Sequence, residues 1–308
     1  MECNGKRLLM IVNPCAGRRK GLRALWRVHK YFESLGFSVT DYVTQARGDG
    51  SVVAKEAANY DLIVCIGGDG TLNEVVSGMR EVSAKTPIGY IPTGSTNDFA
   101  RSIGIPRRPM RAARAIAEGE PTPIDLGLCE DRAFSYIASF GDIVRSSYSM
   151  PQRLKNLIGH AAYIFGGLRD LATMKSYHVR VESEDVSIED DFIFGAVSNS
   201  TSVAGLIRID RSLVNFSDGL FEVMLIRRPR SARQLAKLLR AIASHKFDKS
   251  DRVEFFHASS LTVSASADMP WSLDGERAEG KDEVKISCTP LALPIVGAKY
   301  AAPENEKR

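Results

Sequence analysis

The first third of the chain alternates two kinds of apolar pattern. Strands are predicted at residues 7–12, 37–43, 62–66 and 87–91. The apolar runs at 7–12 and 62–66 predict buried strands, and the second is typical of a strand buried on both faces of a sheet. Between the runs, apolar residues recur every three or four positions, as in helices that cover such a sheet. The first helix is predicted over residues 22–35, and its expected buried face holds Leu22, Leu25, Val28 and Phe32. The alternation predicts a doubly wound parallel sheet of the α/β class.

The pattern changes near residue 123, beyond which strands follow one another directly. These runs of β-type residues lie at 133–139, 177–182, 192–198, 220–226, 252–257, 261–265 and 284–288. Successive strands separated by turns predict a mostly antiparallel β-sandwich. Two helices interrupt it, one with an apolar stripe over 154–168 and one capped by Ser231 with Gln234. We therefore predict an α/β domain at 1–123, a β-rich domain at 124–302 and a frayed tail at 303–308.

Composition and charge exclude several classes of protein. The 308 residues carry a net charge of +4, which is too small to indicate a nucleic-acid partner. Five scattered cysteines without C-x-x-C spacing argue against a disulfide framework and against a zinc site. No apolar run reaches the length of a signal sequence or a membrane span. We expect a cytoplasmic protein whose contact with a membrane is peripheral.

The run at 62–66 leads into a loop in which three glycines surround Asp69. Glycine lets the backbone turn tightly and approach a ligand. Thr71 and Glu74 have capping-box spacing, so a helix N-terminus, which favours anions, is expected after the turn. A carboxylate beside a phosphate requires a cation between them, which suggests a phosphate with Mg²⁺. A plain strand-to-helix turn is an equal alternative here, because the loop matches neither the Walker A nor the G-x-G-x-x-G pattern.

Three more polar loops follow strands of the predicted parallel sheet, at residues 13–17, at Thr44 and at 92–98. The carboxyl ends of parallel strands meet at one edge of a sheet, and ligands bind at that edge. Four such loops therefore indicate a binding site more strongly than one. In the last loop, Ser95 and Asp98 predict a second helix cap, although capping alone leaves the other hydroxyls of the loop unexplained.

A run of arginines follows on the next predicted helix, which ends near residue 117: Arg107, Arg108, Arg111 and Arg114. Such a run is most often a solvated helix face. Contact with a membrane surface is the alternative.

In the β-rich half, Asp274, Gly275 and Glu276 stand at a predicted hairpin. Asp-Gly is a common tight-turn pair, so the residues alone favour a turn. The alternative is a general base with a metal or water partner, as a hydroxyl nucleophile requires. The segment 215–220 is a similar turn, whose oxygen atoms suit a hard cation. The histidines show no metal-binding spacing, and no serine or cysteine has a nucleophile pattern.

Taken together, these segments resemble the diacylglycerol kinase catalytic domain of bacterial lipid kinases. The resemblance lies in GGDGTLNEV at 67–75 and PTGSTNDFA at 92–100, and it extends through IDLG at 124–127, residues 215–220 and LDGE at 273–276. It covers nearly the whole chain in the family's order. The paired motifs belong to a superfamily that includes sphingosine and ceramide kinases and, more distantly, NAD kinases.

The resemblance implies that ATP binds between the two domains. The positions that match the family's contacts with its phosphates and ribose are Asn13, Pro14, Cys15, Ala16, Gly17, Thr44, Gly67, Gly68, Asp69, Gly70, Thr71, Leu72, Asn73, Glu74 and Ser95.

The resemblance also implies the catalytic and metal-binding residues. Asp274 matches the base that takes the proton of a lipid hydroxyl, with Glu276 beside it. Asp69 matches part of a Mg²⁺–water network. A structural Mg²⁺ site is matched by Asn215, Asp218 and Leu220, the outer two through their carbonyl groups.

We therefore expect an ATP- and Mg²⁺-dependent kinase that phosphorylates a hydroxyl of a membrane lipid. Diacylglycerol is the first acceptor to expect. The alternatives are phosphatidylglycerol, a sphingoid base or ceramide, an NAD kinase-type enzyme, or a regulator without catalysis. The chain departs from the family's usual residues at Cys15, at Asp142 and at 203–209, so the acceptor stays open. Whether the protein forms a homodimer also stays open.

Overall fold

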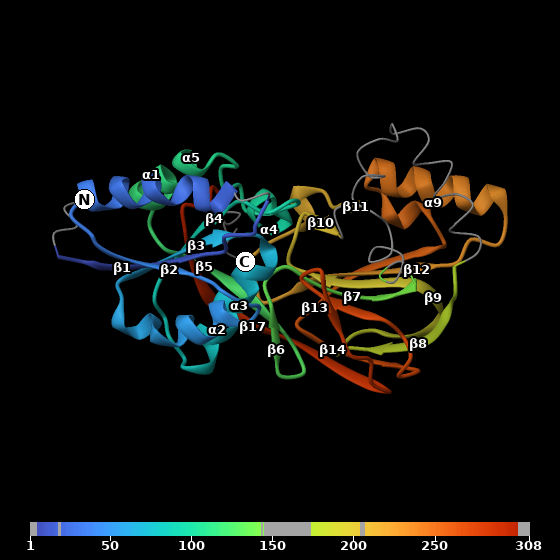
Figure 1. The fold of residues 1–308 in the computed structure, drawn as a ribbon. Helices are drawn as coiled ribbons and strands as arrows, with labels where there is room; N and C mark the ends of the chain where they lie inside the picture. The colour runs from blue at the N-terminus through green and yellow to red at the C-terminus, as the bar shows by residue number, and fades with distance from the viewer. Residues whose placement is uncertain (1–4, 18–19, 143, 145–173, 204–206, 301–308) are drawn as a thin grey trace, which may run out of the picture. The chain divides into compact units, whose positions relative to one another are not determined.

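The computed structural model describes residues 5–17, 20–142, 144, 174–203 and 207–300, and the chain divides into two compact units (Figure 1). Unit 1 comprises Met1–Tyr136, Asn215–Gly219 and Thr289–Arg308, and unit 2 comprises Ile137–Val214 and Leu220–Cys288. The units therefore differ from the contiguous domains expected at 1–123 and 124–302. The tail at 303–308 lies outside the described residues.

Unit 1 is built on a parallel sheet, which confirms the predicted class. Four strands, β1 (Arg7–Val12), β2 (Ser38–Val43), β3 (Leu62–Gly67) and β4 (Ile88–Pro92), stand in the order β4-β3-β1-β2. The end of a long strand, β17 (Glu283–Val296), pairs in parallel with β4. A hairpin of β5 (Thr122–Cys129) and β6 (Arg132–Phe134) belongs to the same unit. These last pairings explain why residues beyond 123 belong to unit 1.

Helices cover both faces of the sheet of unit 1 (Figure 1). On one face lie α1 (Lys20–Ser34) and α5 (Pro109–Glu118), and on the other lie α2 (Asp49–Ala54), η1 (Lys55–Asn59) and α3 (Asp69–Glu81). A short helix, α4 (Asp98–Ser102), follows β4. In α1, Val28 and Phe32 are fully buried as predicted. The prediction for Leu22 was wrong, because 44% of this residue is exposed and the small Gly21 faces inward instead.

Unit 2 is an antiparallel β-sandwich, as predicted. Its strands are β7 (Ile137–Gly141), β8 (Tyr177–Glu182), β9 (Ser187–Ser198), β12 (Phe221–Arg227), β13 (Val253–Ala258), β14 (Ser260–Ala265), β15 (Trp271–Leu273), β16 (Glu276–Ala278) and the start of β17. They follow the order β16-β15-β7-β9-β8-β14-β17, and β12 pairs with both β9 and β13.

Short elements complete unit 2, namely β10 (Ser202–Val203), β11 (Ile207–Arg208), η2 (Arg211–Leu213), α9 (Ala232–Ser244) and η3 (Phe247–Lys249). The cap predicted for α9 is confirmed, because the Ser231 hydroxyl accepts a hydrogen bond from the Gln234 N–H. The single strand predicted over 133–139 is instead two strands, β6 and β7, separated by Ser135 and Tyr136. The helix predicted over 154–168 and residues 204–206 lie outside the described residues.

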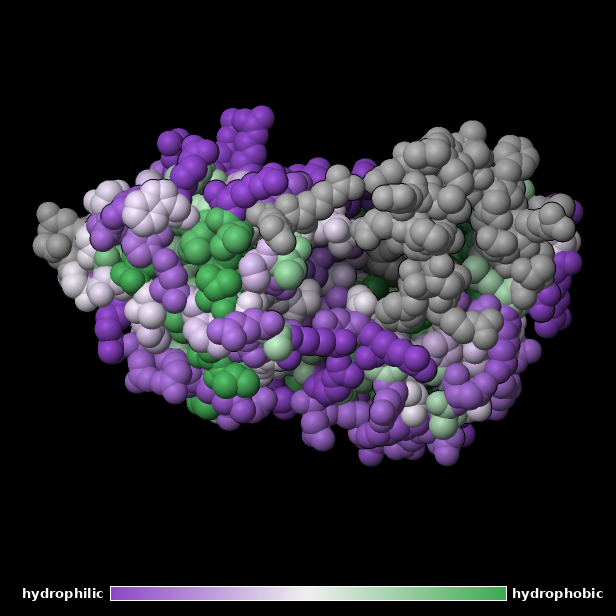
Figure 2. All heavy atoms as spheres, in the orientation of Figure 1, coloured by the Kyte–Doolittle hydropathy of each residue, from purple (hydrophilic) through white to green (hydrophobic). Residues whose placement is uncertain are grey.

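Among the described residues, no helix combines the length and the apolarity that crossing a membrane requires. Figure 2 shows that charged and polar side chains cover most of the visible surface, with smaller apolar areas between them.

Candidate functional site

The loop after β1 is tied to the neighbouring strand and to α3. The backbone N–H of Asn13 donates to the carbonyl of Ile66 (2.9 Å), and its side-chain N–H donates to the Thr71 hydroxyl (3.0 Å). The Asn13 side-chain oxygen accepts from the backbone N–H of Cys15 (2.9 Å). One side chain thus holds the turn at 13–15 and joins it to the first turn of α3.

Gly17 of this loop has a left-handed backbone and leaves no space for a side chain. Its φ is +51°, and a Cβ there would lie 1.8 Å from the carbonyl oxygen of Thr93. The loop after β1 therefore packs directly against the loop after β4.

The loop after β3 forms the N-terminus of α3, but not with the predicted cap. The helix begins at Asp69 with Gly68 as N-cap, and no side chain caps it. The capping box of Thr71 and Glu74 was therefore wrong, because Thr71 already lies within the helix. Its hydroxyl accepts from Asn13 instead. The first turn of α3 consequently presents bare backbone.

Glu74 holds the loop after β2 rather than the start of its own helix. Its two carboxylate oxygens accept from the backbone N–H groups of Gly48 (2.9 Å) and Gly50 (3.2 Å). Thr44, at the beginning of this loop, is buried and its N–H donates to the carbonyl of Val12 (2.9 Å). The predicted residues Thr44 and Glu74 therefore belong to one connected loop system.

The loop after β4 crosses the loop after β3 at their glycines. The backbone N–H groups of Thr93 and Gly94 donate to the carbonyl of Gly67 (2.7 and 3.2 Å). A Cβ on Gly94 would lie 2.6 Å from the Cα of Gly68, so the two backbones touch. Only glycine at Gly94 allows this approach.

The predicted cap by Ser95 was also wrong. Helix α4 has Asn97 as its N-cap, in a left-handed conformation with φ of +51°. No side chain caps this helix, and Ser95 is exposed to solvent. The Asn97 side-chain N–H donates back to the carbonyl of Gly94 (3.0 Å), which closes the loop on itself.

Asp69 is buried where these loops meet. Its Oδ2 accepts from the backbone N–H of Asp98 (3.1 Å) and from the Thr96 hydroxyl (3.4 Å). Asp98 is itself buried, and burial raises the pKa of its carboxyl, although the nearby Arg101 guanidinium opposes this shift. The sequence had assigned Asp98 only a capping role, and its position at the end of the PTGSTND motif was the available signal.

The loop system of unit 1 fits a phosphate group with a divalent cation. An uncapped helix of 13 residues presents its N-terminus there, and the glycine backbones leave no side chain in front of it. The carboxylate of Asp69 stands at the same N-terminus. Backbone N–H groups suit the phosphate, and the carboxylate suits Mg²⁺ or its bound water. All predicted nucleotide-binding residues belong to unit 1.

Asp274 and Glu276 belong to unit 2, where Asp274 and Gly275 form the two-residue hairpin turn between β15 and β16 and Glu276 begins β16. Asp274 and Gly275 both have positive φ (+50° and +83°), which is typical of a type I′ turn and confirms the predicted hairpin. Asp274 is only 4% exposed. Its Oδ1 accepts from the backbone N–H of Ile137 (3.1 Å), and Glu276 is half-buried opposite Leu273. The turn therefore holds a buried carboxylate.

The loop Asn215–Gly219 is held by a carboxylate that sequence reasoning did not assign. Buried Asp125 accepts from the backbone N–H groups of Gly219 (2.7 Å) and Leu291 (2.8 Å). Burial raises the pKa of Asp125, and these two hydrogen bonds oppose the shift. The side-chain oxygen of Asn215 accepts from the Ser217 N–H and from the Tyr300 hydroxyl. The IDLG segment of the family was the signal for Asp125.

The predicted metal residues Asn215 and Asp218 lie in this loop, and Leu220 begins the next segment of unit 2. Within the described residues, no three His, Cys, Asp or Glu side chains form a group that could hold a metal ion. The oxygen of the Asn215 side chain is already used inside the loop. A cation here would therefore depend on backbone carbonyls, Asp218 and water, which fits the carbonyl ligands that the resemblance implies.

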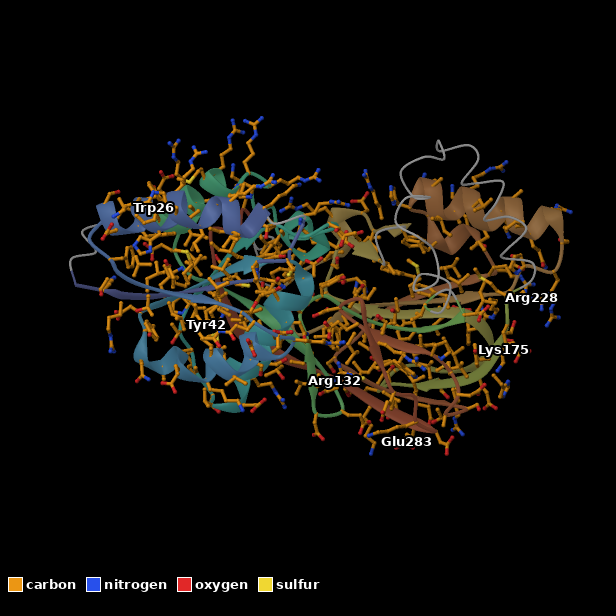
Figure 3. All side chains as sticks on the ribbon, viewed as in Figure 1. Trp26, Tyr42, Arg132, Lys175, Arg228 and Glu283 are labelled. Atoms are coloured by element: carbon orange, nitrogen blue, oxygen red, sulfur yellow. The ribbon has the colours of Figure 1, made fainter. Side chains whose placement is uncertain are left out.

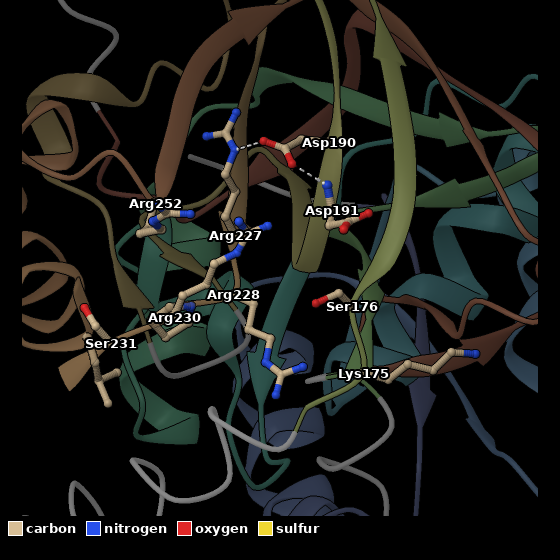
Figure 4. Close-up of a pocket in the computed structure, with 11 residues that line it drawn as sticks. Lys175, Ser176, Asp190, Asp191, Arg227, Arg228, Arg230, Ser231 and Arg252 are labelled. Carbon is tan, nitrogen blue, oxygen red and sulfur yellow. Dashed lines mark hydrogen bonds and ion pairs between the residues drawn. The ribbon is translucent and has the colours of Figure 1, made fainter. Parts of the chain in front are cut away.

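A cavity of about 790 Å³ lies elsewhere in unit 2 (Figure 4). Its described lining consists of Lys175, Ser176, Asp190, Asp191, Arg227, Arg228, Pro229, Arg230, Ser231, Leu235 and Arg252. Arg227 donates to Asp190 (2.5 Å) and to Glu254 (2.6 Å), so much of its charge is balanced. None of the predicted site residues is among this lining. Asp142 is also buried in this unit and accepts from the backbone N–H of the lining residue Lys175 (3.1 Å).

Two family models match this chain. Residues 7–129 match the diacylglycerol kinase catalytic domain, and residues 146–297 match the YegS C-terminal NAD kinase beta sandwich-like domain. The diacylglycerol kinase of Bacillus subtilis (strain 168) is 33% identical over 276 residues, covering 88% of this chain and 90% of the relative. That of Staphylococcus saprophyticus is 32% identical over 273 residues, covering 88% of this chain and 89% of the relative.

Solved structures show the same fold. A structure described as a diacylglycerol kinase from Bacillus anthracis matches with a TM-score of 0.71 and 20% identity, covering 94% of this chain and 96% of that one. Another structure from the same organism matches with a TM-score of 0.77 and 22% identity, covering 94% and 95%. Given the two family models and relatives above 30% identity over most of their length, the chain belongs to the diacylglycerol kinase family and is a kinase whose phosphoryl acceptor is an alcohol group.

Proposed function

We propose that the protein transfers the γ-phosphate of ATP to the hydroxyl group of diacylglycerol, with Mg²⁺ as the metal. The convergence of four loops at the uncapped N-terminus of α3, with the Asp69 carboxylate beside it, carries this proposal. Phosphoryl transfer depends mainly on positioning and on neutralising charge, and this arrangement offers both. The names of the curated relatives support diacylglycerol as the acceptor.

In this proposal the residues of unit 1 bind the phosphates. The first turn of α3 and the glycine backbones donate N–H groups to phosphate oxygens. Asn13 keeps the loop after β1 against α3, and Glu74 keeps the loop with Thr44 in place. Bound Mg²⁺ would offset the negative charge of the phosphates, and Asp69 is the carboxylate best placed to hold it or its water.

Asp274 is proposed as the group that takes the proton of the lipid hydroxyl. The proton moves to a carboxylate oxygen of Asp274, while the hydroxyl oxygen forms the new bond to the γ-phosphorus. The bond between the γ-phosphorus and the bridging oxygen breaks, and its electron pair leaves with ADP. The hydrogen bond from Ile137 orients the carboxylate before the substrate binds. Glu276 is proposed to assist from the other side of the turn. Asn215, Asp218 and Leu220 are proposed to hold a structural Mg²⁺ rather than to react.

Transfer of labelled phosphate from ATP tests this function. The assay offers detergent-dispersed diacylglycerol, phosphatidylglycerol, sphingosine and ceramide, with NAD as a non-lipid acceptor, and each reaction runs with Mg²⁺ and with excess chelator. Label on diacylglycerol that disappears with the chelator supports the proposal. Label on a different lipid alone would show that this lipid, and not diacylglycerol, is the acceptor. Label on NAD alone would refute a lipid kinase, and ATP binding without any transfer would indicate a regulator.

A further inference from the structure

The outer surface formed by α1 and α5 of unit 1 is strongly basic. We define the cationic face by its exposed residues Lys20, Arg23, Arg27, Lys30, Arg107, Arg108, Arg111 and Arg114. The only acidic residues within the two helices are Glu33 and Glu118, each near the C-terminal end of its helix. The two helices pack beside each other on one face of the sheet, and nitrogen-tipped side chains project outward from them in Figure 3. Positive charge is therefore gathered on one side of unit 1.

Within the part of the chain that the structure describes, most of this charge forms no ion pair. Lys30 forms an ion pair with Glu33 (2.7 Å). Among the described residues, Arg23 and Arg27 make no ion pair, and neither do Arg111 and Arg114 of α5. An isolated run of arginines is often only a solvated face. Two adjacent helices with the same charge form a much broader surface, which suits a broad anionic partner.

Apolar side chains border the cationic face. Trp26 is 66% exposed and Leu22 is 44% exposed, and both lie on α1. The Lys30 ammonium group lies 4.8 Å from the centroid of the Trp26 ring. The His29 ring is stacked with the Trp26 ring, and 6.0 Å separates the two centroids. The exposed indole leaves a large apolar surface in contact with water, directly beside cations. Tryptophan is enriched at the interface of membranes, where its ring is partly apolar and its cationic neighbours meet headgroups.

We propose that the cationic face docks on a bilayer that contains anionic phospholipids, with the Trp26 indole at the level of the headgroups. The choice of a membrane as partner rests on the proposed lipid kinase function, whereas the choice of surface rests on α1 and α5. The inner side of α1 is fixed in the core by Val28 and Phe32. The helix therefore lies along the membrane surface, and its charges act together with those of α5.

The two tryptophans of the chain give a direct measurement of docking. Trp271 is 1% exposed and Trp26 is 66% exposed, so only Trp26 can change its solvent greatly when this surface is covered. The full chain, without ATP or diacylglycerol, is titrated with vesicles of phosphatidylcholine and phosphatidylglycerol in equal parts. We expect the fluorescence to shift to the blue and acrylamide quenching to fall. Vesicles of phosphatidylcholine alone should cause neither change.

Two further observations tie this signal to the surface. The Trp26→Phe variant keeps only the buried tryptophan, and it should show no shift with either vesicle. High salt should release the protein, because the screening length falls from about 8 Å at physiological ionic strength to about 3 Å at 1 M. A shift that survives high salt, or one that appears in Trp26→Phe, would refute the docking surface.

Charge reversal tests which cations matter. The double variant Arg23→Glu/Arg27→Glu should lower partitioning onto the mixed vesicles by at least about tenfold, since each basic residue near an anionic surface adds to binding. The control Lys55→Glu/Lys85→Glu makes the same change in net charge at exposed residues of η1 and of the turn after α3, on the opposite face of the sheet. This control variant should lower partitioning onto the mixed vesicles much less. Equal losses in both variants would refute the proposal, because net charge alone would then explain binding.

Other occupants of the surface give different results. A blue shift that grows with protein concentration in the absence of vesicles would indicate a second copy of the chain and would overturn the proposal. A shift with single-stranded RNA but not with vesicles would do the same. Phosphoryl transfer to detergent-dispersed diacylglycerol should be unchanged in Arg23→Glu/Arg27→Glu. If the unaltered chain lacks that transfer, the proposed function fails while the vesicle result still decides the docking surface.

Discussion

Asp274 and Ile137 are joined by two hydrogen bonds that run in opposite directions. The backbone N–H of Asp274 donates to the carbonyl of Ile137 (2.9 Å), and the backbone N–H of Ile137 donates to the Asp274 carboxylate (3.1 Å). The pair extends the ladder between β7 and β15 by one residue into the turn. It keeps a buried carboxylate in one orientation although its backbone is left-handed.

Replacing Asp274 by Asn separates the role of the carboxylate from the role of the turn. Asparagine tolerates positive φ and keeps an oxygen that can accept from Ile137. We expect phosphoryl transfer to fall by about 10²–10⁴-fold because the proton acceptor is lost. The thermal midpoint should change little. Near-normal turnover in Asp274→Asn would refute the assignment of the base.

Gly17 and Gly48 offer a matched pair of alanine substitutions. Both have positive φ, and alanine in that region costs about 1–2 kcal/mol at either position. At Gly48 a Cβ meets nothing within 4 Å, whereas at Gly17 it meets the Thr93 carbonyl at 1.8 Å. Gly17→Ala should therefore lower the free energy of unfolding by roughly 1–3 kcal/mol more than Gly48→Ala does, because the backbone must move. Urea unfolding of both variants measures the difference.

The same pair also tests the nucleotide site. Moving the loop after β1 away from the loop after β4 should raise the KM for ATP in Gly17→Ala. Gly48→Ala should leave that KM close to its original value. If both variants bind ATP equally well, the contact between the two loops is not needed for binding.

Glu74 is expected to order the loop that begins at Thr44. Replacing it by Gln leaves one acceptor oxygen for two backbone N–H groups, which removes roughly 1–3 kcal/mol of local stability. Hydrogen exchange at Gly48 and Gly50 should therefore become at least about tenfold faster. Asn73→Ala is the control, since Asn73 is the neighbouring residue of the same helix and its side-chain N–H donates to the carbonyl of Ala133 (2.9 Å). Equal exchange rates in Glu74→Gln and the original chain would contradict the proposed tether.

Buried Asp125 makes the stability of unit 1 dependent on pH. Burial raises its pKa above the ordinary value of 3.8, so the folded state binds the proton more tightly than the unfolded state. The stability that protonation adds is complete below 3.8 and is lost as pH rises through the raised pKa. We expect the thermal midpoint of the original chain, relative to Asp125→Asn, to increase as pH falls through this window. A difference that does not vary with pH would show that the carboxyl is not perturbed.

Local patterns predicted the main elements well, because each depends on few residues. Continuous apolar runs gave β1 and β3, which are buried on both faces, and the pair Ser231 and Gln234 gave the cap of α9. The two other predicted caps were wrong. Thr71 and Ser95 have the residue spacing of a capping motif, but neither is the N-cap of its helix. Packing against the neighbouring loops makes α3 begin after Gly68 and α4 begin after Asn97. The Glu74 carboxylate accepts hydrogen bonds from the backbone N–H groups of Gly48 and Gly50 instead of from the start of its own helix.

The sequence by itself determined the α/β and β-sandwich classes, the family and the loops that carry the chemistry, since motif residues lie close together along the chain. Only the tertiary structure decided which partners the buried carboxylates have. Asp69 meets Asp98 across 29 residues, and Asp125 meets Leu291 across 166. It also decided that the compact units are not contiguous, because β17 returns to pair with β4. Contacts between distant segments depend on packing in three dimensions, and no local spacing specifies them.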